Sequence, residues 1–197
     1  MRIKIILGIL LSTSLFACCN RIDRDQVELL NDPQDNAWHD QALRDWHSGD
    51  FKAYSKQDKV KFYVRTFWSS EVFNTKESDK KYEVIKQEDP DGEIMLKMLE
   101  CDSKKVINDT INIAYIMIVR KVYPYEWQEK MLARIIALLD REKNAYVIER
   151  ALMFIKVFGR AEHLPIMERY LNHPHPLLHG VVPLMLEEFK KRLASGV

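Results

Sequence analysis

The sequence predicts an all-α protein in which an irregular helical front half is followed by antiparallel helical hairpins stacked side by side. Apolar residues make up 47% of the 197 residues, which is enough for a packed core. The chain has only 6 Gly and 7 Pro, too few for a loop-rich protein. From about residue 106 onward, apolar residues recur every three or four positions and short polar breaks separate the runs.

The first 17 residues have the layout of a secretory signal peptide. Arg2 and Lys4 give a positive start, residues 5–11 are apolar, and the small Ala17 precedes Cys18. The apolar run is shorter than the roughly 20 residues that a permanent membrane-spanning helix needs. We therefore expect residues 1–17 to be removed on export.

The end of this segment, Leu15-Phe16-Ala17-Cys18, resembles the lipobox of bacterial lipoproteins. Phe16 departs from the family pattern, which has a smaller residue there, and an ordinary signal with a coincidental cysteine is the alternative. The resemblance implies that Cys18 is lipidated and becomes the mature N-terminus. Each buried acyl carbon stabilises membrane association by about 0.8 kcal/mol, so several chains anchor firmly.

The same resemblance implies a location in the cell envelope. The mature domain would lie in the periplasm or outside the cell, held to a membrane through its anchor. Family members with aspartate after the lipidated cysteine are retained at the inner membrane. Cys19 occupies that position here, which favours the outer membrane where the cell has one.

The front half of the mature chain has weak patterns. Residues 18–36 are polar and acidic and predict a lipidated tether or a weak first helix, and residues 37–104 predict an irregular helical region. Trp38, Ala42 and Trp46 recur every four residues and share one face of a helix over 37–47. This face is either packed in the core or exposed to a ligand.

Between residues 56 and 100 the expected elements are short. Residues 56–73 suit a helix or a buried strand, and the helix is favoured because Val60, Val64 and Phe67 follow helical spacing. Residues 74–81 predict a charged loop, and residues 82–86 fit either type. Asp89-Pro90-Asp91-Gly92 is a strong turn, followed by a short helix over 93–100.

Residues 105–197 predict helices that pair into hairpins. The second helices of the pairs start near Asp109, Ala145 and Pro176, so the spacings are 145 − 109 = 36 and 176 − 145 = 31 residues. Gly159 suits a helix end, Pro165 suits a first turn, and Pro183 lies inside the last helix. Superposing the second helices aligns four apolar positions: Ile111, Val147 and Leu178; Tyr115, Ala151 and Val182; Val119, Ile155 and Leu186; Val122, Phe158 and Phe189.

Over residues 126–192 this layout resembles HEAT-like repeats, with Asp140 in the turn within a repeat and a breaker between units. The resemblance implies an α-solenoid whose neighbouring units cover each other's apolar faces. An irregular helical bundle is the alternative. Residues 111–119 contain only Asn112 as a polar member, and a helix that is apolar almost all round belongs in the middle of a stack.

No pattern for a metal or cofactor emerges. His163, His173, His175 and His179 are close in sequence, and the last two are four residues apart, but they lack an HExxH arrangement and lie in or near a proline-rich turn. Turn or surface histidines are the favoured interpretation. Cys19 and Cys101 could pair in an oxidising compartment, although a buried Cys101 thiol is favoured.

Charge and motifs exclude other classes of activity. The whole chain carries +1; without Arg2 and Lys4 it has 30 − 2 = 28 bases against 29 acids, which argues against nucleic-acid binding. Ser69-Ser70 satisfies only the composition of a hydrolase, and there is no GxSxG and no phosphate-binding loop.

The sequence therefore predicts a membrane-tethered, non-enzymatic scaffold that binds a partner protein through its helical-repeat surface, with Cys18 as its only assigned site. An envelope hydrolase is the alternative, with a site in the front half around four residues: His39, His47, Trp68 and Glu71. A carrier of small ligands is a third hypothesis and would require a closed apolar cavity.

Overall fold

The protein is all-helical, as predicted. The computed structural model describes residues 23–69 and 76–196, with side chains outside the range 68–81, and this part of the chain contains no strand. The predicted signal peptide, Cys18, Cys19 and Glu71 lie outside the described residues. None of the described helices is both long and apolar enough to cross a membrane.

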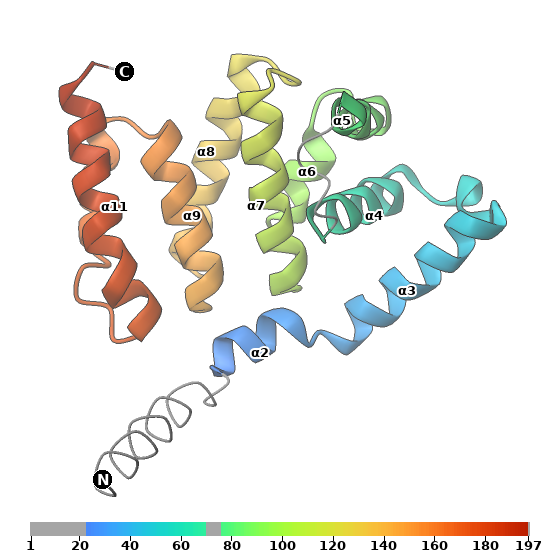
Figure 1. Cartoon of the computed structure of the whole chain (residues 1–197), viewed down its shortest axis with the longest axis horizontal. Helices are drawn as coiled ribbons and strands as arrows, with labels where there is room; N and C mark the ends of the chain where they lie inside the picture. The colour runs from blue at the N-terminus through green and yellow to red at the C-terminus, as the bar shows by residue number, and fades with distance from the viewer. Residues whose placement is uncertain (1–22, 70–75, 197) are drawn as a thin grey trace, which may run out of the picture.

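Three long helices stand side by side in one layer: α7 (Lys104–Val119), α9 (Ala145–Phe158) and α11 (Pro176–Ala194) (Figure 1). A helix precedes each of them and packs against it: α6 (Glu93–Met98), α8 (Tyr125–Leu139) and α10 (Leu164–Glu168). This is the predicted series of helical hairpins, in a solenoid-like arrangement.

The predicted starts of two second helices are confirmed, and the third is wrong. α9 begins at Ala145 and α11 at Pro176, but α7 begins at Lys104 rather than near Asp109. The apolar alignment therefore holds between α9 and α11 and fails on α7, where Tyr115 is 40% and Val119 57% exposed. Both side chains were expected in the core.

The start of α7 explains the error. Ser103 caps the helix, with its Oγ accepting from the N–H of Val106, and Asp109 lies inside the helix with no exposed surface. Starting α7 at 104 moves the spacing to α9 to 145 − 104 = 41 residues. Seven inward positions then coincide: Val106 with Val147, Ile107 with Ile148, Thr110 with Ala151, Ile111 with Leu152, Ile113 with Phe154, Ala114 with Ile155, and Met117 with Phe158.

Other predictions for the back half are confirmed. α7 occupies the middle of the molecule, where it contacts α2, α4, α6, α8 and α9. Gly159 caps the end of α9, Pro165 lies in the first turn of α10, and Pro183 lies inside α11. α10 itself is shorter than predicted and follows a 3-10 turn over Ala161–His163.

The front half contains α3 (Pro33–Ser48), a 3-10 turn over Asp50–Ala53, α4 (Lys56–Ser69) and α5 (Lys76–Glu88). The favoured helix after residue 56 is thus confirmed. The loop predicted for residues 74–81 is wrong from residue 76 onward, because α5 begins there and continues through residues 82–86.

The tether predicted for residues 18–36 is too long. Residues Arg24–Leu30 form the helix α2, which packs against α7 and α9, and Asp35 in α3 is buried. The weak first helix was the correct alternative. Its acids Asp25 and Glu28 bond to residues at the start of α9, and Leu29 enters the apolar core.

Candidate functional site

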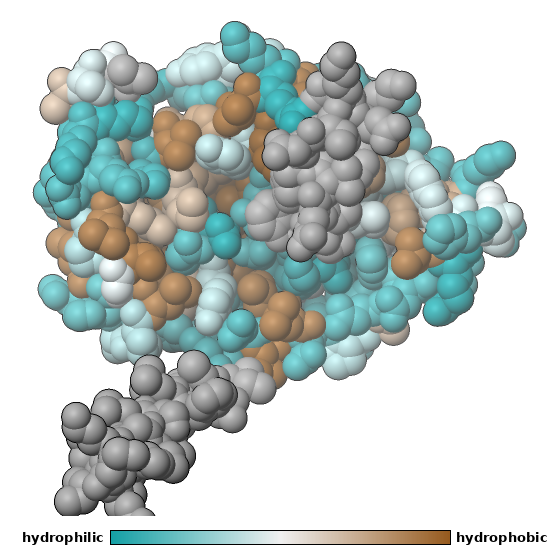
Figure 2. Space-filling model, viewed as in Figure 1, coloured by the Kyte–Doolittle hydropathy of each residue, from teal (hydrophilic) through white to brown (hydrophobic). Residues whose placement is uncertain are grey.

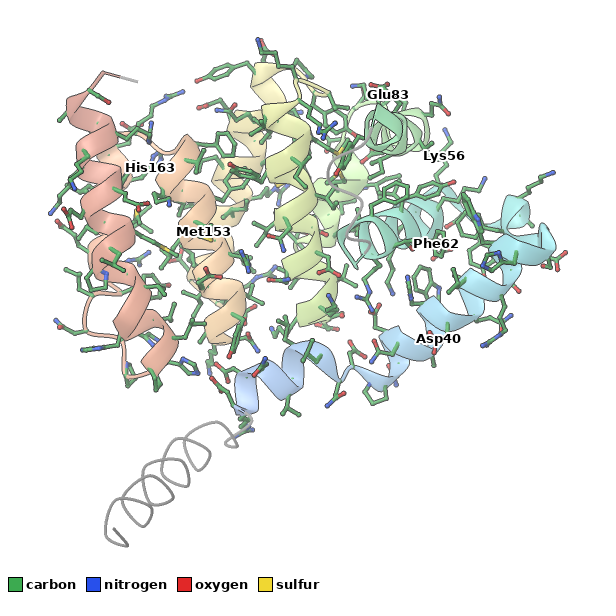
Figure 3. All side chains as sticks on the ribbon, viewed as in Figure 1. Asp40, Lys56, Phe62, Glu83, Met153 and His163 are labelled. Atoms are coloured by element: carbon green, nitrogen blue, oxygen red, sulfur yellow. The ribbon has the colours of Figure 1, made fainter. Side chains whose placement is uncertain are left out.

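A groove of about 430 Å³ lies between α7 and α9. Ile111 and Phe154 contribute apolar surface to its lining, and Tyr115, Met153 and Val157 line it further along the two helices. The lining residues follow helical spacing of three and four on each helix, so one face of α7 meets one face of α9. Figure 3 labels Met153 on α9.

The lining combines buried and open positions of the two helices. Ile111, Asn112 and Phe154 are buried, whereas Tyr115 is 40% exposed and Ile116 is half-buried. The ring of Tyr115 lies 5.5 Å from that of Phe158, which connects the two helices at one end of the groove. The groove therefore follows directly from the corrected register of α7.

Asn112 places an unpaired amide at this site. The residue lines the groove and is 7% exposed, and within the described residues its Nδ2 donates no hydrogen bond. A buried donor without a partner costs about 1–3 kcal/mol, so such groups usually find an acceptor on protein, water or ligand. An oxygen acceptor on an occupant of the groove would satisfy it.

The charges at the rim of the groove are paired. Arg150 Nε lies 3.3 Å from Glu149 Oε2, and Lys156 Nζ lies 2.6 Å from Glu188 Oε2 on α11. Burial raises the pKa of Glu149 even though both cations oppose that effect. The hydrogen bond from Lys156 lowers the pKa of Glu188. The site is thus an apolar surface with balanced charges at its border.

Exposed apolar side chains continue beyond the groove. Val119 follows Tyr115 by one turn of α7, and Leu184 on α11 is 63% exposed. Figure 2 shows hydrophobic residues between hydrophilic ones over α9 and α11 on this face. Exposed apolar patches with polar borders are typical of surfaces that bind other molecules.

Of the four front-half residues proposed for an enzyme, the structure describes the side chains of His39 and His47, and these two have different surroundings. His39 Nε2 lies 3.1 Å from Thr66 Oγ1 and its ring stacks on Phe62, whereas His47 is exposed near the end of α3. Burial, and then the charge of Arg65, lower the pKa of His39. The side chain of Trp68 and all of Glu71 lie outside the described residues.

The Trp face of α3 belongs to an aromatic cluster. Trp46 stacks on Phe62 at 5.4 Å and meets the edges of Phe51 and Tyr63, and these three partners are buried. Trp46 itself is 45% exposed beside a hollow of about 340 Å³. The prediction that this face packs in the core is therefore confirmed for the side of Trp46 that contacts the three rings, and its other side remains open.

The back-half histidines hold turns and helix starts. His163 Nδ1 accepts from the N–H of Arg160, and His175 Nδ1 accepts from the N–H of Leu177 at the start of α11. His173 Nδ1 accepts from the N–H of His175. Over residues 23–69 and 76–196, histidines, cysteines and acids form no group arranged to hold a metal ion.

Cys101 is half-buried and its Sγ lies 3.6 Å from the carbonyl oxygen of Ser103. Burial raises the pKa of this thiol, which disfavours the reactive thiolate. Its pairing with Cys19 stays a prediction, because Cys19 lies outside the described residues.

A buried charge cluster joins the two halves and was missed in the sequence. Arg65 of α4 forms an ion pair with Asp35 of α3, with its Nε 2.7 Å from Oδ2, and its Nη1 donates to Asp109 Oδ2 of α7 at 3.0 Å. Lys61 and Lys105 complete the cluster at 2.7 and 2.8 Å from the same two acids. The sequence does not reveal this cluster, because Arg65 lies 65 − 35 = 30 positions from Asp35 and 44 positions from Asp109 along the chain.

Compared with protein-family models, with curated proteins and with solved structures, the chain matches none of them.

Proposed function

We propose that this protein is a bacterial envelope lipoprotein with HEAT-like repeats, anchored through Cys18, that binds a segment of a partner protein in the groove between α7 and α9. The observation that carries the proposal is the groove itself, an open apolar surface with the unpaired amide of Asn112 in its lining. The lipobox-like sequence before Cys18 supports the anchor.

The shape of the site favours a protein segment over a small ligand. The groove is open on one side, and exposed apolar side chains continue past its end to Val119. A carrier would enclose its ligand in a cavity that buries most of the ligand's surface. An amphipathic or extended segment instead places apolar side chains in a groove and leaves its polar face in water.

The polar groups of the groove suit such an occupant. A main-chain carbonyl or a side-chain oxygen of the segment would accept from Asn112 Nδ2, and apolar side chains would contact Met153 and Val157. The charges at the rim are already paired with each other, so a bound segment does not have to supply partners for them.

The anchor is tested by labelling with a palmitate analogue in a bacterial host that lipidates exported proteins. The native chain and Cys101→Ala should take up the label and Cys18→Ala should not. Equal labelling of the native chain and Cys18→Ala would remove the anchor from the proposal.

The groove is tested by crosslinking and affinity capture from envelopes with two matched variants. Met153→Glu places a charge in the groove, and Ala133→Glu places one on the exposed face of α8, away from it. The native chain and Ala133→Glu should recover the same protein, and Met153→Glu, shown to be folded by its thermal unfolding curve, should lose it. A partner retained by Met153→Glu would place binding elsewhere.

A further inference from the structure

The first turns of α9 and α11 lie at one edge of the molecule, and α2 runs along this edge beneath α7 and α9 (Figure 1). α2 is pinned to this edge by hydrogen bonds to helix starts. Asp25 Oδ2 accepts from the N–H of Ala145, the first residue of α9, at 2.8 Å. Asn144 Nδ2 donates to the carbonyl oxygen of Asp25 at 2.9 Å, and the Leu29 side chain is buried. A carboxylate at a helix N-terminus satisfies a free N–H and interacts favourably with the helix dipole.

Asp23 connects the same segment to α11. Its Oδ2 lies 2.8 Å from His175 Nε2, and its Oδ1 accepts from the N–H of Asp25 at 3.0 Å. Because His175 Nδ1 accepts from Leu177, the neutral ring carries its proton on Nε2 and donates it to Asp23. Residue 23 is therefore fixed against the first turns of two helices of the repeat layer.

The outer face of α2 is apolar where it leaves the protein. Val27 is 36% and Leu30 52% exposed, and their spacing of three places both on one face of the helix. The acids of α2 and of its cap make bonds within the protein: Asp23 to His175, Asp25 to α9, and Glu28 to Asn144. The groove between α7 and α9 runs along those helices and so rises away from this edge.

We propose that the edge formed by α2 and the first turns of α9 and α11 is the surface that faces the phospholipid bilayer. This rests on the proposed anchor at Cys18. Only five residue steps separate Cys18 from Asp23, and an extended chain spans at most about 18 Å over that length. Because α2 is held against the domain and lies close to the anchor, the domain keeps a fixed orientation on the membrane, with Val27 and Leu30 toward the lipid surface.

This orientation places the groove beside the membrane rather than against it. A partner that is itself attached to the same membrane would meet the open faces of α7 and α9 from the side. α2 carries two acids, Asp25 and Glu28, against one base, Arg24, so its net charge gives no attraction to anionic lipids. The orientation therefore depends on the anchor and the apolar contact and persists on neutral lipid.

The test uses the full chain, expressed and lipidated in a bacterial host, purified from membranes and reconstituted in phosphatidylcholine vesicles that contain a lipid with a nitroxide headgroup. In a background of Cys19→Ser and Cys101→Ser, a fluorophore is attached to Leu30→Cys or, as the matched control, to Glu126→Cys near the start of α8. We expect nitroxide quenching to be several-fold stronger at position 30. Adding Asp23→Ala and Asp25→Ala should abolish this contrast while the protein still floats with the vesicles.

Equal quenching at positions 30 and 126 in a chain that floats would overturn the proposed orientation and leave the anchor intact. A contrast that survives Asp23→Ala and Asp25→Ala would show that α2 does not fix the orientation. A chain that fails to float would instead contradict the anchor at Cys18, and the orientation would fall with it.

Discussion

The two halves of this protein are held together by different interactions. In the back half, α7, α9 and α11 bury apolar side chains at matching positions, as Ile107 and Ile148 do. In the front half, α3 and α4 depend on the aromatic cluster around Phe62 and on the ion pairs of Arg65. The repeat layer is thus built from local periodicity, whereas the front half is built from contacts between distant residues.

The strongest test of this comparison is the replacement of Asp109 by alanine. The change leaves Arg65, which is 5% exposed, and Lys105 without their shared carboxylate on α7. Removing one member of a buried ion pair costs about 3–5 kcal/mol. Urea unfolding should show a loss of this size.

The matched control for that variant is Lys130→Ala. It breaks the pair with Glu93, whose two side chains are 60% and 52% exposed, and should cost about 1 kcal/mol or less. A loss for Asp109→Ala as small as that of the control would mean that the buried charges do not hold the halves together.

The apolar contacts of the back half are tested by Leu152→Ala. Leu152 is fully buried in α9, and a change from leucine to alanine at such a site costs about 2–5 kcal/mol. Leu184→Ala on α11, at 63% exposure, should change the unfolding free energy by about 0.5 kcal/mol or less. Similar losses of unfolding free energy for Leu152→Ala and Leu184→Ala would contradict the burial of Leu152 between the helices of the layer.

A smaller effect is expected for Asp25→Ala, which removes the carboxylate that caps α9 from α2. Loss of a capping carboxylate costs about 0.5–2 kcal/mol. Amide hydrogen exchange should become faster in α2 and in the first turn of α9, while Asp40→Ala on the exposed side of α3 leaves both unchanged. Unchanged exchange in Asp25→Ala would mean that α2 is not held by this bond.

The smallest expected effect is on pH dependence in the front half. Burial and Arg65 lower the pKa of His39 below its ordinary value of 6.5. The unfolded chain therefore takes up a proton first, so the stability contributed by neutral His39 is complete above pH 6.5 and is lost as the pH falls toward the lower folded pKa. Urea unfolding from pH 7 to 5 should show a decline that His39→Gln reduces. An identical decline in the variant would assign it to other groups.

The back half could be predicted better than the front half because local signals mark its helices, whereas distant contacts hold the front half. The starts of α9 and α11 were predicted because the breakers before Ala145 and Pro176 and the apolar spacing after them are local signals. The start of α7 was predicted wrongly, because aspartate is a common helix cap and Asp109 suggested a helix start. In the structure Asp109 instead pairs with Arg65, 44 residues away. The helix α2 was predicted only as an alternative to a tether for a similar reason, since its hydrogen-bond partners Asn144 and Ala145 lie more than a hundred residues along the chain.

The misplaced start of α7 also hid the candidate site. The predicted start near Asp109 assigned Tyr115 and Val119 to the core. The structure places both at the surface, with Tyr115 beside the groove. In the sequence Asn112 is only a polar exception in an apolar helix. Since a groove is formed by two helices together, its position required the relative register of α7 and α9, which periodicity on one helix does not provide.

The central claim, that a partner protein binds in the groove between α7 and α9, is tested most directly by site-specific photocrosslinking in living cells. A photoreactive phenylalanine analogue is placed at position 115, beside the groove, or at position 125, where Tyr125 is 57% exposed at the start of α8. We expect one reproducible crosslinked protein from position 115 and none from position 125. A crosslink to the same protein from position 125 alone, or equally from both positions, would contradict the claim.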